Sequence, residues 1–153
     1  GNIINLEIFN CLSDCIDMDH SVYKIENLIC ADSLNDGLDL MESVVSAYNL
    51  NFSRNMDKSI SVGEASELTV NTMSISDSNI GLASKDDSTV NLSNVIIKNS
   101  NIGLDSYRKN TRYQSSGKIN LQNYNLYNNK LDLRFINPSN IQFNFKELNY
   151  ILN

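Results

Sequence analysis

Three residues near the middle of the chain carry side chains that could perform acid–base chemistry together. Tyr107 follows Lys85 by 22 residues, and Arg108 comes next. A lysine can act as a base, a tyrosine as an acid, and an arginine as a fixed positive charge that neutralises a carboxylate. If residues 22 apart lie side by side, these three form one candidate catalytic set.

A second set of candidate residues is acidic and follows the same spacing, because Asp17 and Asp39 are 22 residues apart. Two ionised carboxylates about 5 Å apart repel by roughly 3 kcal/mol at an effective dielectric near 20, before screening by water. A cation, a shared proton or a substrate donor relieves such pairs. The alternative is a pair of ordinary solvated acids. The candidate substrate-binding residues are Asp17, Asp19, Asp39, Asp86, Asp105 and Arg112.

Metal binding is the third chemistry that we consider. Asp39, Glu42 and Glu64 are the candidate ligands, and their carboxylate oxygens suit calcium. No residue pattern in the chain demands a cofactor. If there is one, the acidic ligands favour calcium. The chain has one histidine, His20, so neither a histidine-rich metal site nor a Ser-His-Asp triad can be assembled. We expect His20 to be a surface residue in a turn.

The elements that must position these residues come from a 22-residue repeat. Five similar segments contain residues 15, 37, 59, 81 and 103, and a sixth, Leu131-Asp132-Leu133, follows after seven inserted residues. Apolar residues alternate with a spacing of two, as in Ile16 and Met18, which is the period of a β-strand. The pattern predicts three short strands in each repeat.

Repetition of such strands predicts an all-β fold, a single parallel β-helix of about six coils of 22 residues. Gly37, Gly81 and Gly103 are expected at a bend that needs an unusual backbone angle. Asparagines recur at positions 5, 27, 49, 94 and 123. We expect their side-chain amides to stack and to bond one another along the axis.

If Ile16 and Met18 point into the core, the residues that alternate with them point outward. One outward column then contains Asp17, Asp39, Ser61, Ala83 and Asp105, and the next contains Asp19, Met41, Gly63, Lys85 and Tyr107. The outward positions of the second strand are mostly uncharged polar residues: Lys24, Ser46, Thr69, Asn91 and Asn120. Charge and aromatic side chains therefore concentrate on one face.

These Gly, Asn and Ile positions resemble those of the right-handed parallel β-helix superfamily, the pectate-lyase-like proteins, over residues 5 to about 145. The resemblance implies a right-handed helix. Its members include polysaccharide lyases, glycosidases and uronate epimerases, together with non-enzymatic spikes and adhesins. Its lyases use a lysine or arginine base, often with calcium. Segments such as Asn35-Asp36-Gly37 are similar to its glycosidase motifs, but they occur in a different order along the chain. Because the glycosidase pattern is incomplete, we expect a lyase or epimerase ahead of a glycoside hydrolase. Whether the chain is an enzyme stays open.

Composition restricts the remaining classes. The chain has 153 residues, of which 41% are hydrophobic, and this predicts one β-helix domain over residues 1–153. A net charge of −6 argues against nucleic-acid and anionic-membrane partners. No apolar run approaches the roughly 20 residues of a membrane span. Three cysteines do not make a disulfide framework; we expect Cys30 in the core and Cys11 close enough to Cys15 to oxidise.

Two further segments carry expectations of their own. Residues 107–116 interrupt the repeat and bring three cations and two tyrosines beside the acidic face. This segment could bind a sugar acid, or it could be a surface loop whose charges balance Asp86 and Asp105. Residues 144–153 could form a C-terminal cap. The first coil has no cap before Asn5, so we expect a segment of a longer β-helix protein, with missing coils or a stacking partner at that end.

The sequence therefore leads to two functional hypotheses. The first is a carbohydrate-directed module, extracellular or at the cell surface, that binds or modifies an acidic polysaccharide on one sheet face. The second is a structural β-helix without chemistry, such as a spike, an adhesin shaft or a spacer. The concentration of charge on one face favours the first.

Overall fold

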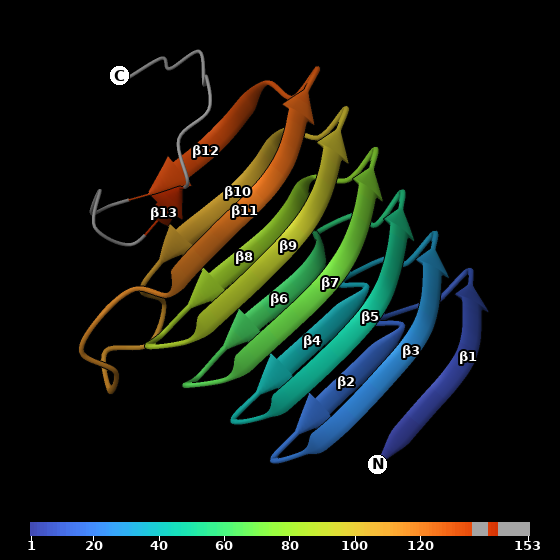
Figure 1. The fold of residues 1–153 in the computed structure, drawn as a ribbon, viewed down its shortest axis with the longest axis horizontal. Coiled ribbons are helices and arrows are strands. Elements are labelled where there is room, and N and C mark those ends of the chain that lie inside the picture. Colours follow the sequence, from blue (N-terminus) through green and yellow to red (C-terminus); the bar gives the residue numbers. More distant parts are fainter. Residues whose placement is uncertain (136–140, 144–153) are drawn as a thin grey trace.

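The computed structural model describes residues 1–135 and the backbone of 141–143, and these residues form thirteen strands in two parallel sheets (Figure 1). Sheet A contains β1 (Asn2–Phe9), β3 (Val22–Ala31), β5 (Val44–Ser53), β7 (Glu67–Ser76), β9 (Thr89–Lys98), β11 (Lys118–Tyr127) and β13 (Ile141–Phe143). Sheet B contains β2 (Ile16–Asp19), β4 (Leu38–Met41), β6 (Lys58–Gly63), β8 (Ile80–Lys85), β10 (Ile102–Tyr107) and β12 (Leu131–Phe135). The chain alternates between the sheets and is a parallel β-solenoid, as predicted.

The strand register confirms the 22-residue repeat. Ile16 pairs with Leu38, Leu38 with Ile60, and Ile60 with Leu82. The pairing continues across the insertion, where Leu104 lies beside Leu133. The described residues complete about five turns, close to the expected six.

Each turn has two strands, where the sequence pattern suggested three. The strands of sheet A from β3 to β11 are ten residues long and contain both of the expected segments. Their pairing skips one residue in the middle, such as Glu26 beside Tyr48, and Figure 1 shows these strands curved. No glycine or proline interrupts β3 or β5 at this point, so the backbone bends without ending the strand.

The repeated glycines provide space, and the expectation of an unusual backbone angle was wrong. No glycine has a positive φ. A Cβ atom on Gly37 would lie 2.5 Å from Cδ1 of Phe52, and one on Gly81 would lie 2.5 Å from the carbonyl oxygen of Gly103. The left-handed angles occur instead at the strand ends, on non-glycine residues that include Asn10, Asp32, Arg54, Asp77, Asn99 and Asn128 after sheet A and His20, Glu42, Glu64 and Asp86 after sheet B.

The core lies between the two sheets and is built from stacked aliphatic columns. Four leucine and isoleucine side chains on sheet B are completely buried: Leu38, Ile60, Leu82 and Leu104. Columns on sheet A, including Leu28, Leu50 and Met73, pack in the same core cluster. Burial of one column against another is the main favourable contribution to the free energy of folding.

Polar ladders run parallel to these columns. Asn27 donates its amide to Asn5 at 2.9 Å, and Asn49 donates to Asn27 at 3.3 Å, so the predicted amide ladder forms, although it lies at the bend of sheet A. At the corner between the sheets, the backbone N–H of Ser43 donates to Ser66 Oγ at 3.0 Å. Such ladders satisfy the backbone groups that the turns expose.

The sequence predicted an uncovered first coil and a C-terminal cap at the two ends of the solenoid. β1 is an edge strand, paired with β3 on one side among the described residues. Exposed apolar side chains of the first coil include Ile4, Phe9 and Leu12. A stacking partner or further coils at this edge stays a prediction. The cap expected at residues 144–153 lies outside the described residues.

Candidate functional site

The outer face of sheet B aligns the predicted columns. Asp17 pairs with Asp39, Asp39 with Ser61, and Ser61 with Ala83. Ala83 in turn pairs with Asp105. Because alternate residues of these strands are in the core, this column points away from it.

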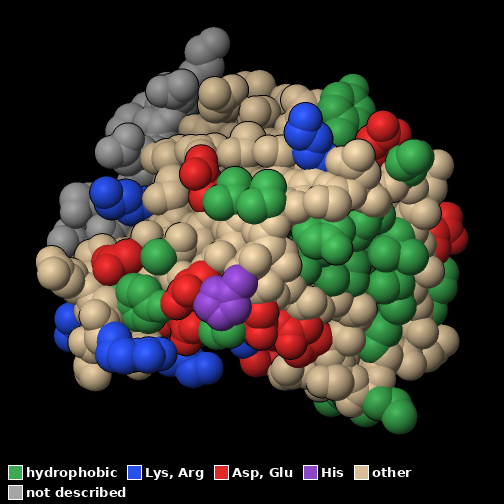
Figure 2. Space-filling model, turned by 90° about the horizontal axis from the view of Figure 1, so that it is seen from below, with side chains coloured by type: hydrophobic (Ala, Val, Ile, Leu, Met, Phe, Trp, Pro, Cys, Tyr) green, Lys and Arg blue, Asp and Glu red, His purple; other side chains and the backbone are tan. Residues whose placement is uncertain are grey.

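Acidic groups dominate the half of the face formed by β2 and β4. Burial raises the pKa of Asp17 above its ordinary value, and the charges of Asp19, Asp39 and Asp14 raise it further. Asp17 and Asp19 are exposed, whereas Asp39 is half-buried. Figure 2 shows acidic side chains gathered around the histidine, with lysine and arginine side chains beside them. A donor or cation would be stabilised at this half of the face.

Lys85 stands at the centre of the face and lacks an ion pair within the described part of the chain. Its side chain crosses Gly63, because a Cβ atom placed on Gly63 would lie 3.1 Å from Lys85 Cε and 3.5 Å from Nζ. Only 7% of Lys85 is exposed. Burial lowers the pKa of Lys85, although the nearby charge of Asp39 opposes that shift. An amine with a lowered pKa is a better base at neutral pH.

Ser61 lies beneath this face, two residues before Gly63 on β6. It is fully buried, and its Oγ has no hydrogen-bond partner among the described residues. A buried hydroxyl without a partner costs free energy. The pairing that aligned Ser61 was predicted, but its burial was not.

The proposed catalytic set comes together only in part. Tyr107 pairs with Lys85 in the register of β8 and β10, and burial raises the pKa of the Tyr107 hydroxyl. Arg108 is exposed on the following loop and donates to the carbonyl of Gln114 at 3.4 Å. The structure therefore ties Arg108 to its own loop. Arg112, also on this loop, is exposed.

Asp86 and Asp87 hold the loop of residues 108–117 in place. Asp86 Oδ1 accepts the backbone N–H groups of Lys109 at 2.7 Å and Asn110 at 2.8 Å. Asp87 accepts two more N–H groups, from Gln114 and Ser115. Asp86 is almost completely buried. Its carboxylate serves the loop conformation, in contrast to the substrate-binding role expected from the sequence.

Asp105 is also engaged by a protein group. Arg134, on β12, donates its Nε to Asp105 at 3.0 Å and a second N–H to the other carboxylate oxygen. Asp105 is fully buried, so the expectation that this column faces water fails at this end of the face. The bidentate contact explains how the carboxylate tolerates burial.

The expected calcium ligands do not form a metal site. No group of three or more histidine, cysteine, aspartate or glutamate side chains within the described ranges could hold a metal ion. Glu42 contacts His20 at 3.0 Å and accepts a hydrogen bond from Tyr113 at 3.3 Å. Glu42 and Glu64 lie in the turns after their strands, whereas Asp39 lies within β4. His20 is exposed in its turn, as expected.

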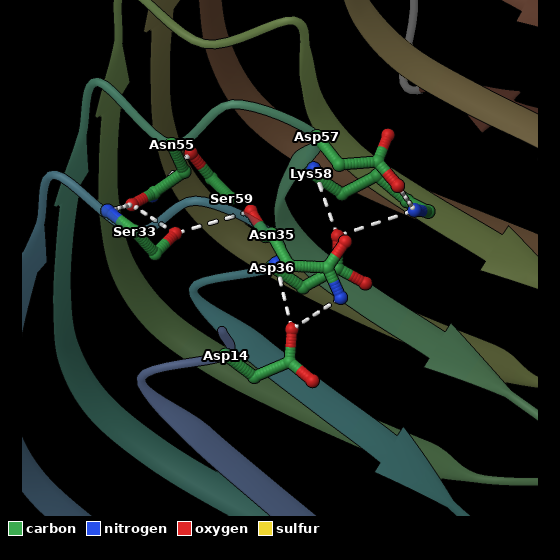
Figure 3. Close-up of polar contacts among 8 residues, drawn as sticks. All are labelled: Asp14, Ser33, Asn35, Asp36, Asn55, Asp57, Lys58 and Ser59. Atoms are coloured by element: carbon green, nitrogen blue, oxygen red, sulfur yellow. Dashed lines mark hydrogen bonds and ion pairs between the residues drawn. The ribbon is translucent and has the colours of Figure 1, made fainter. Parts of the chain in front are cut away.

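The turns that lead into sheet B carry a second polar cluster, drawn in Figure 3. Asp14 Oδ1 accepts the backbone N–H of Asp36 at 2.7 Å, and Asp36 Oδ1 accepts the backbone N–H of Lys58 at 2.9 Å. Lys58 Nζ contacts Asp36 at 3.2 Å and also binds Asp57. Burial lowers the pKa of Lys58, but hydrogen bonding to Asp57 and the charge of Asp36 outweigh it and raise the pKa.

Cys11 lies close to Cys15 as expected, but the disulfide joins a pair that the sequence analysis did not consider. Cys15 forms a disulfide with Cys30, while Cys11 keeps a free thiol whose pKa is raised by burial. Cys30 is fully buried in the core, as expected. The repeat contained the signal: Cys15 occupies the column of Gly37, Cys30 occupies that of Phe52, and Gly37 meets Phe52 one coil later.

Comparison of the chain with protein-family models, with curated proteins and with solved structures gave no match. Within the described residues, no helix is long and apolar enough to cross a membrane. The parallel β-solenoid is thus the level at which the chain can be classified.

Proposed function

We propose that this chain is a carbohydrate-directed β-helix module that binds an acidic polysaccharide on the outer face of sheet B. The observation that carries the proposal is Lys85, an almost buried lysine without an ion pair in the described residues, on the strand next to that of Ser61, whose hydroxyl has no partner there. A buried cation without an ion pair costs free energy, which a ligand carboxylate would offset.

The neighbours of Lys85 suit the rest of a sugar acid. Asp39 and Asp17 could accept hydrogen bonds from sugar hydroxyls, since carboxylates are strong acceptors. Tyr107, which is next to Lys85 in the register, offers an aromatic ring with a polar end. The acidic half of the face would orient hydroxyls while Lys85 holds the carboxylate.

The same geometry supports chemistry of the lyase or epimerase type. Removal of the proton beside a uronate carboxylate needs a base that is neutral near the working pH, and burial lowers the pKa of Lys85. The resemblance to the pectate-lyase-like superfamily agrees with this assignment. Binding requires the ammonium form and proton abstraction requires the amine, so the two roles differ in their dependence on pH.

Location outside the cell belongs to the same proposal. The Cys15–Cys30 disulfide supports it, because disulfides persist in oxidising compartments. Extracellular or cell-surface exposure would also bring the module to polysaccharides.

The second candidate is a structural shaft. The observation that favours it is the outer face of sheet A, where uncharged residues such as Ser46, Thr69 and Asn91 align across three strands. Apart from Lys24 at its β3 end, this column of uncharged side chains offers many weak hydrogen bonds and little to select an anion.

A glycan array with uronic-acid and sulfated oligosaccharides tests the proposal, followed by calorimetric titration of the best ligand. We expect Lys85→Met to weaken binding about 10- to 100-fold, the value of one hydrogen bond to a charged group. Lys24→Met is the matched control, since Lys24 is exposed on sheet A beside Ser46. Failure of every acidic glycan to bind, or equal loss in both variants, would favour the shaft.

A lyase assay separates catalysis from binding. Elimination creates an unsaturated uronate that absorbs in the ultraviolet, and we expect its formation to require Lys85. Binding without product formation would define a binding module, whereas product formation that survives Lys85→Met would exclude Lys85 as the base.

A further inference from the structure

The sulfur atoms of the three cysteines lie together at the first corner of the solenoid. Cys11 is in the turn after β1, and Cys15 immediately precedes β2. Cys11 Sγ lies 3.1 Å from Cys15 Sγ, which is itself bonded to Cys30. A free thiol in contact with a disulfide is the arrangement from which thiol–disulfide exchange proceeds.

Backbone hydrogen bonds hold Cys11 and Cys15 in place. The carbonyl of Cys11 accepts the N–H of Leu34 at 2.9 Å, and the N–H of Cys15 donates to the carbonyl of Asp36 at 3.0 Å. Both contacts are to the next coil, so that the turn containing these cysteines is fixed on the solenoid. The short separation of the two sulfurs follows from this stacking.

The third cysteine has surroundings that suit a thiol. Cys30 is fully buried on β3, between Ile8 on β1 and Phe52 on β5. Its Sγ lies 3.6 Å from Oδ1 of Asn55, a distance at which a thiol can donate a weak hydrogen bond. A neutral thiol at this position would be accommodated by the core, as buried free cysteines commonly are.

We propose that Cys11, Cys15 and Cys30 form a thiol–disulfide exchange site in which Cys15 alternates between two partners. The Cys11 thiol gives its proton to solvent and attacks Cys15 Sγ as the thiolate. The Cys11–Cys15 bond forms as the Cys15–Cys30 bond breaks, and the electron pair leaves on Cys30 Sγ, which takes up a proton. The step has no net oxidation or reduction and needs no external reagent.

The exchange changes which parts of the fold are joined covalently. The Cys15–Cys30 bond ties the turn before β2 to β3, whereas a Cys11–Cys15 bond closes a loop within one turn. Exchange therefore releases β2, the edge strand of sheet B, from its covalent link to sheet A. This inference is independent of the proposed carbohydrate function.

Disulfide mapping of the full chain tests the proposal. The protein is held at about pH 8.5 without reductant to populate thiolates. It is then trapped with N-ethylmaleimide in acidic denaturant and cleaved before aspartates. Cleavage before Asp14 and Asp17 puts the three cysteines in separate peptides. We expect Cys11–Cys15 pairs to appear with time in the native chain and to be absent from Cys11→Ser. Retention of Cys15–Cys30 alone overturns the proposal.

A second variant checks the same contact without relying on the exchange equilibrium. Cys30→Val keeps an apolar side chain in the column of Phe52 and Ile75 and leaves Cys11 and Cys15 as free thiols. With oxidised glutathione, we expect this variant to close a Cys11–Cys15 disulfide. Accumulation of glutathione on both cysteines would contradict the sulfur contact. Hydrogen exchange of β2 should be faster in the closed Cys11–Cys15 form than in the native chain.

Discussion

Replacement of Gly81 by alanine tests the close approach of adjacent coils. A Cβ atom at this position would lie 2.5 Å from the carbonyl oxygen of Gly103 and 2.8 Å from Cγ2 of Ile97. The first of these atoms belongs to the backbone, so the coils must separate. Overpacking costs about 1–3 kcal/mol, whereas alanine recovers about 0.4–1 kcal/mol by restricting the unfolded chain. We expect Gly81→Ala to lower the free energy of unfolding by about 1–2 kcal/mol.

The matched variant is Gly63→Ala, where the new Cβ would meet the end of the flexible Lys85 side chain. We expect its free energy of unfolding to stay within about 0.5 kcal/mol of the parent, since Lys85 can move. Urea denaturation of the three proteins measures both effects, provided that the slopes agree. An equal loss in the two variants, or a gain in Gly81→Ala, would refute the stacking geometry of the coils.

Leu38→Ala, its control Leu12→Ala, Asp17→Asn and Lys85→Met probe the core and the outer face of sheet B by urea denaturation. Leu38→Ala should cost about 2–5 kcal/mol because Leu38 is fully buried, and Leu12→Ala, at 87% exposure, should cost less than about 0.5 kcal/mol; similar losses would show a wrong register. The raised pKa of Asp17 means that its folded state binds the proton more tightly, so Asp17→Asn should stabilise the chain near pH 7 but not near pH 3. The lowered pKa of Lys85 means that its unfolded state binds the proton more tightly. Lys85→Met should therefore be at least as stable as the parent near pH 7, with an advantage that shrinks as the pH approaches about 10. A constant difference across pH would contradict either assignment.

Strand register is the feature that sequence periodicity predicted best. A period of 22 determines which residues pair in sheet B from β2 to β10, and the pairs Asp17–Asp39 and Lys85–Tyr107 follow from it without any knowledge of side-chain packing. Alternation then assigns each residue to the core or to the outside. Both rules depend only on strand geometry.

The burial of side chains on the outer face of sheet B, and their hydrogen-bond partners, could not be predicted from the periodicity. Asp105 is covered because Arg134 reaches it from the next coil, beyond an insertion whose length shifts the numbering. Asp86 is used by the loop of residues 108–117, and a periodic pattern says nothing about the conformation of an inserted loop. The space above Gly63 depends on the direction of the Lys85 side chain. These features arise from side-chain conformations and not from the repeat.

The disulfide was predictable from the repeat in part. Sequence proximity suggested Cys11 with Cys15, but the columns show that Cys15 and Cys30 face each other across the corner, as Gly37 and Phe52 do in the next coil. The pairing was therefore present in the repeat, provided that residues are compared across strands as well as along one column.

The central claim is that an acidic glycan binds at Lys85, and nuclear magnetic resonance titration of the ¹⁵N-labelled chain with a uronic-acid oligosaccharide tests it most directly. We predict that the amide shifts fall on β4, β6, β8 and β10, that Lys85→Met requires about 10- to 100-fold more ligand to produce them, and that Lys24→Met leaves them unchanged. Shifts on the outer face of sheet A, or an unchanged affinity after Lys85→Met, would contradict the proposed site.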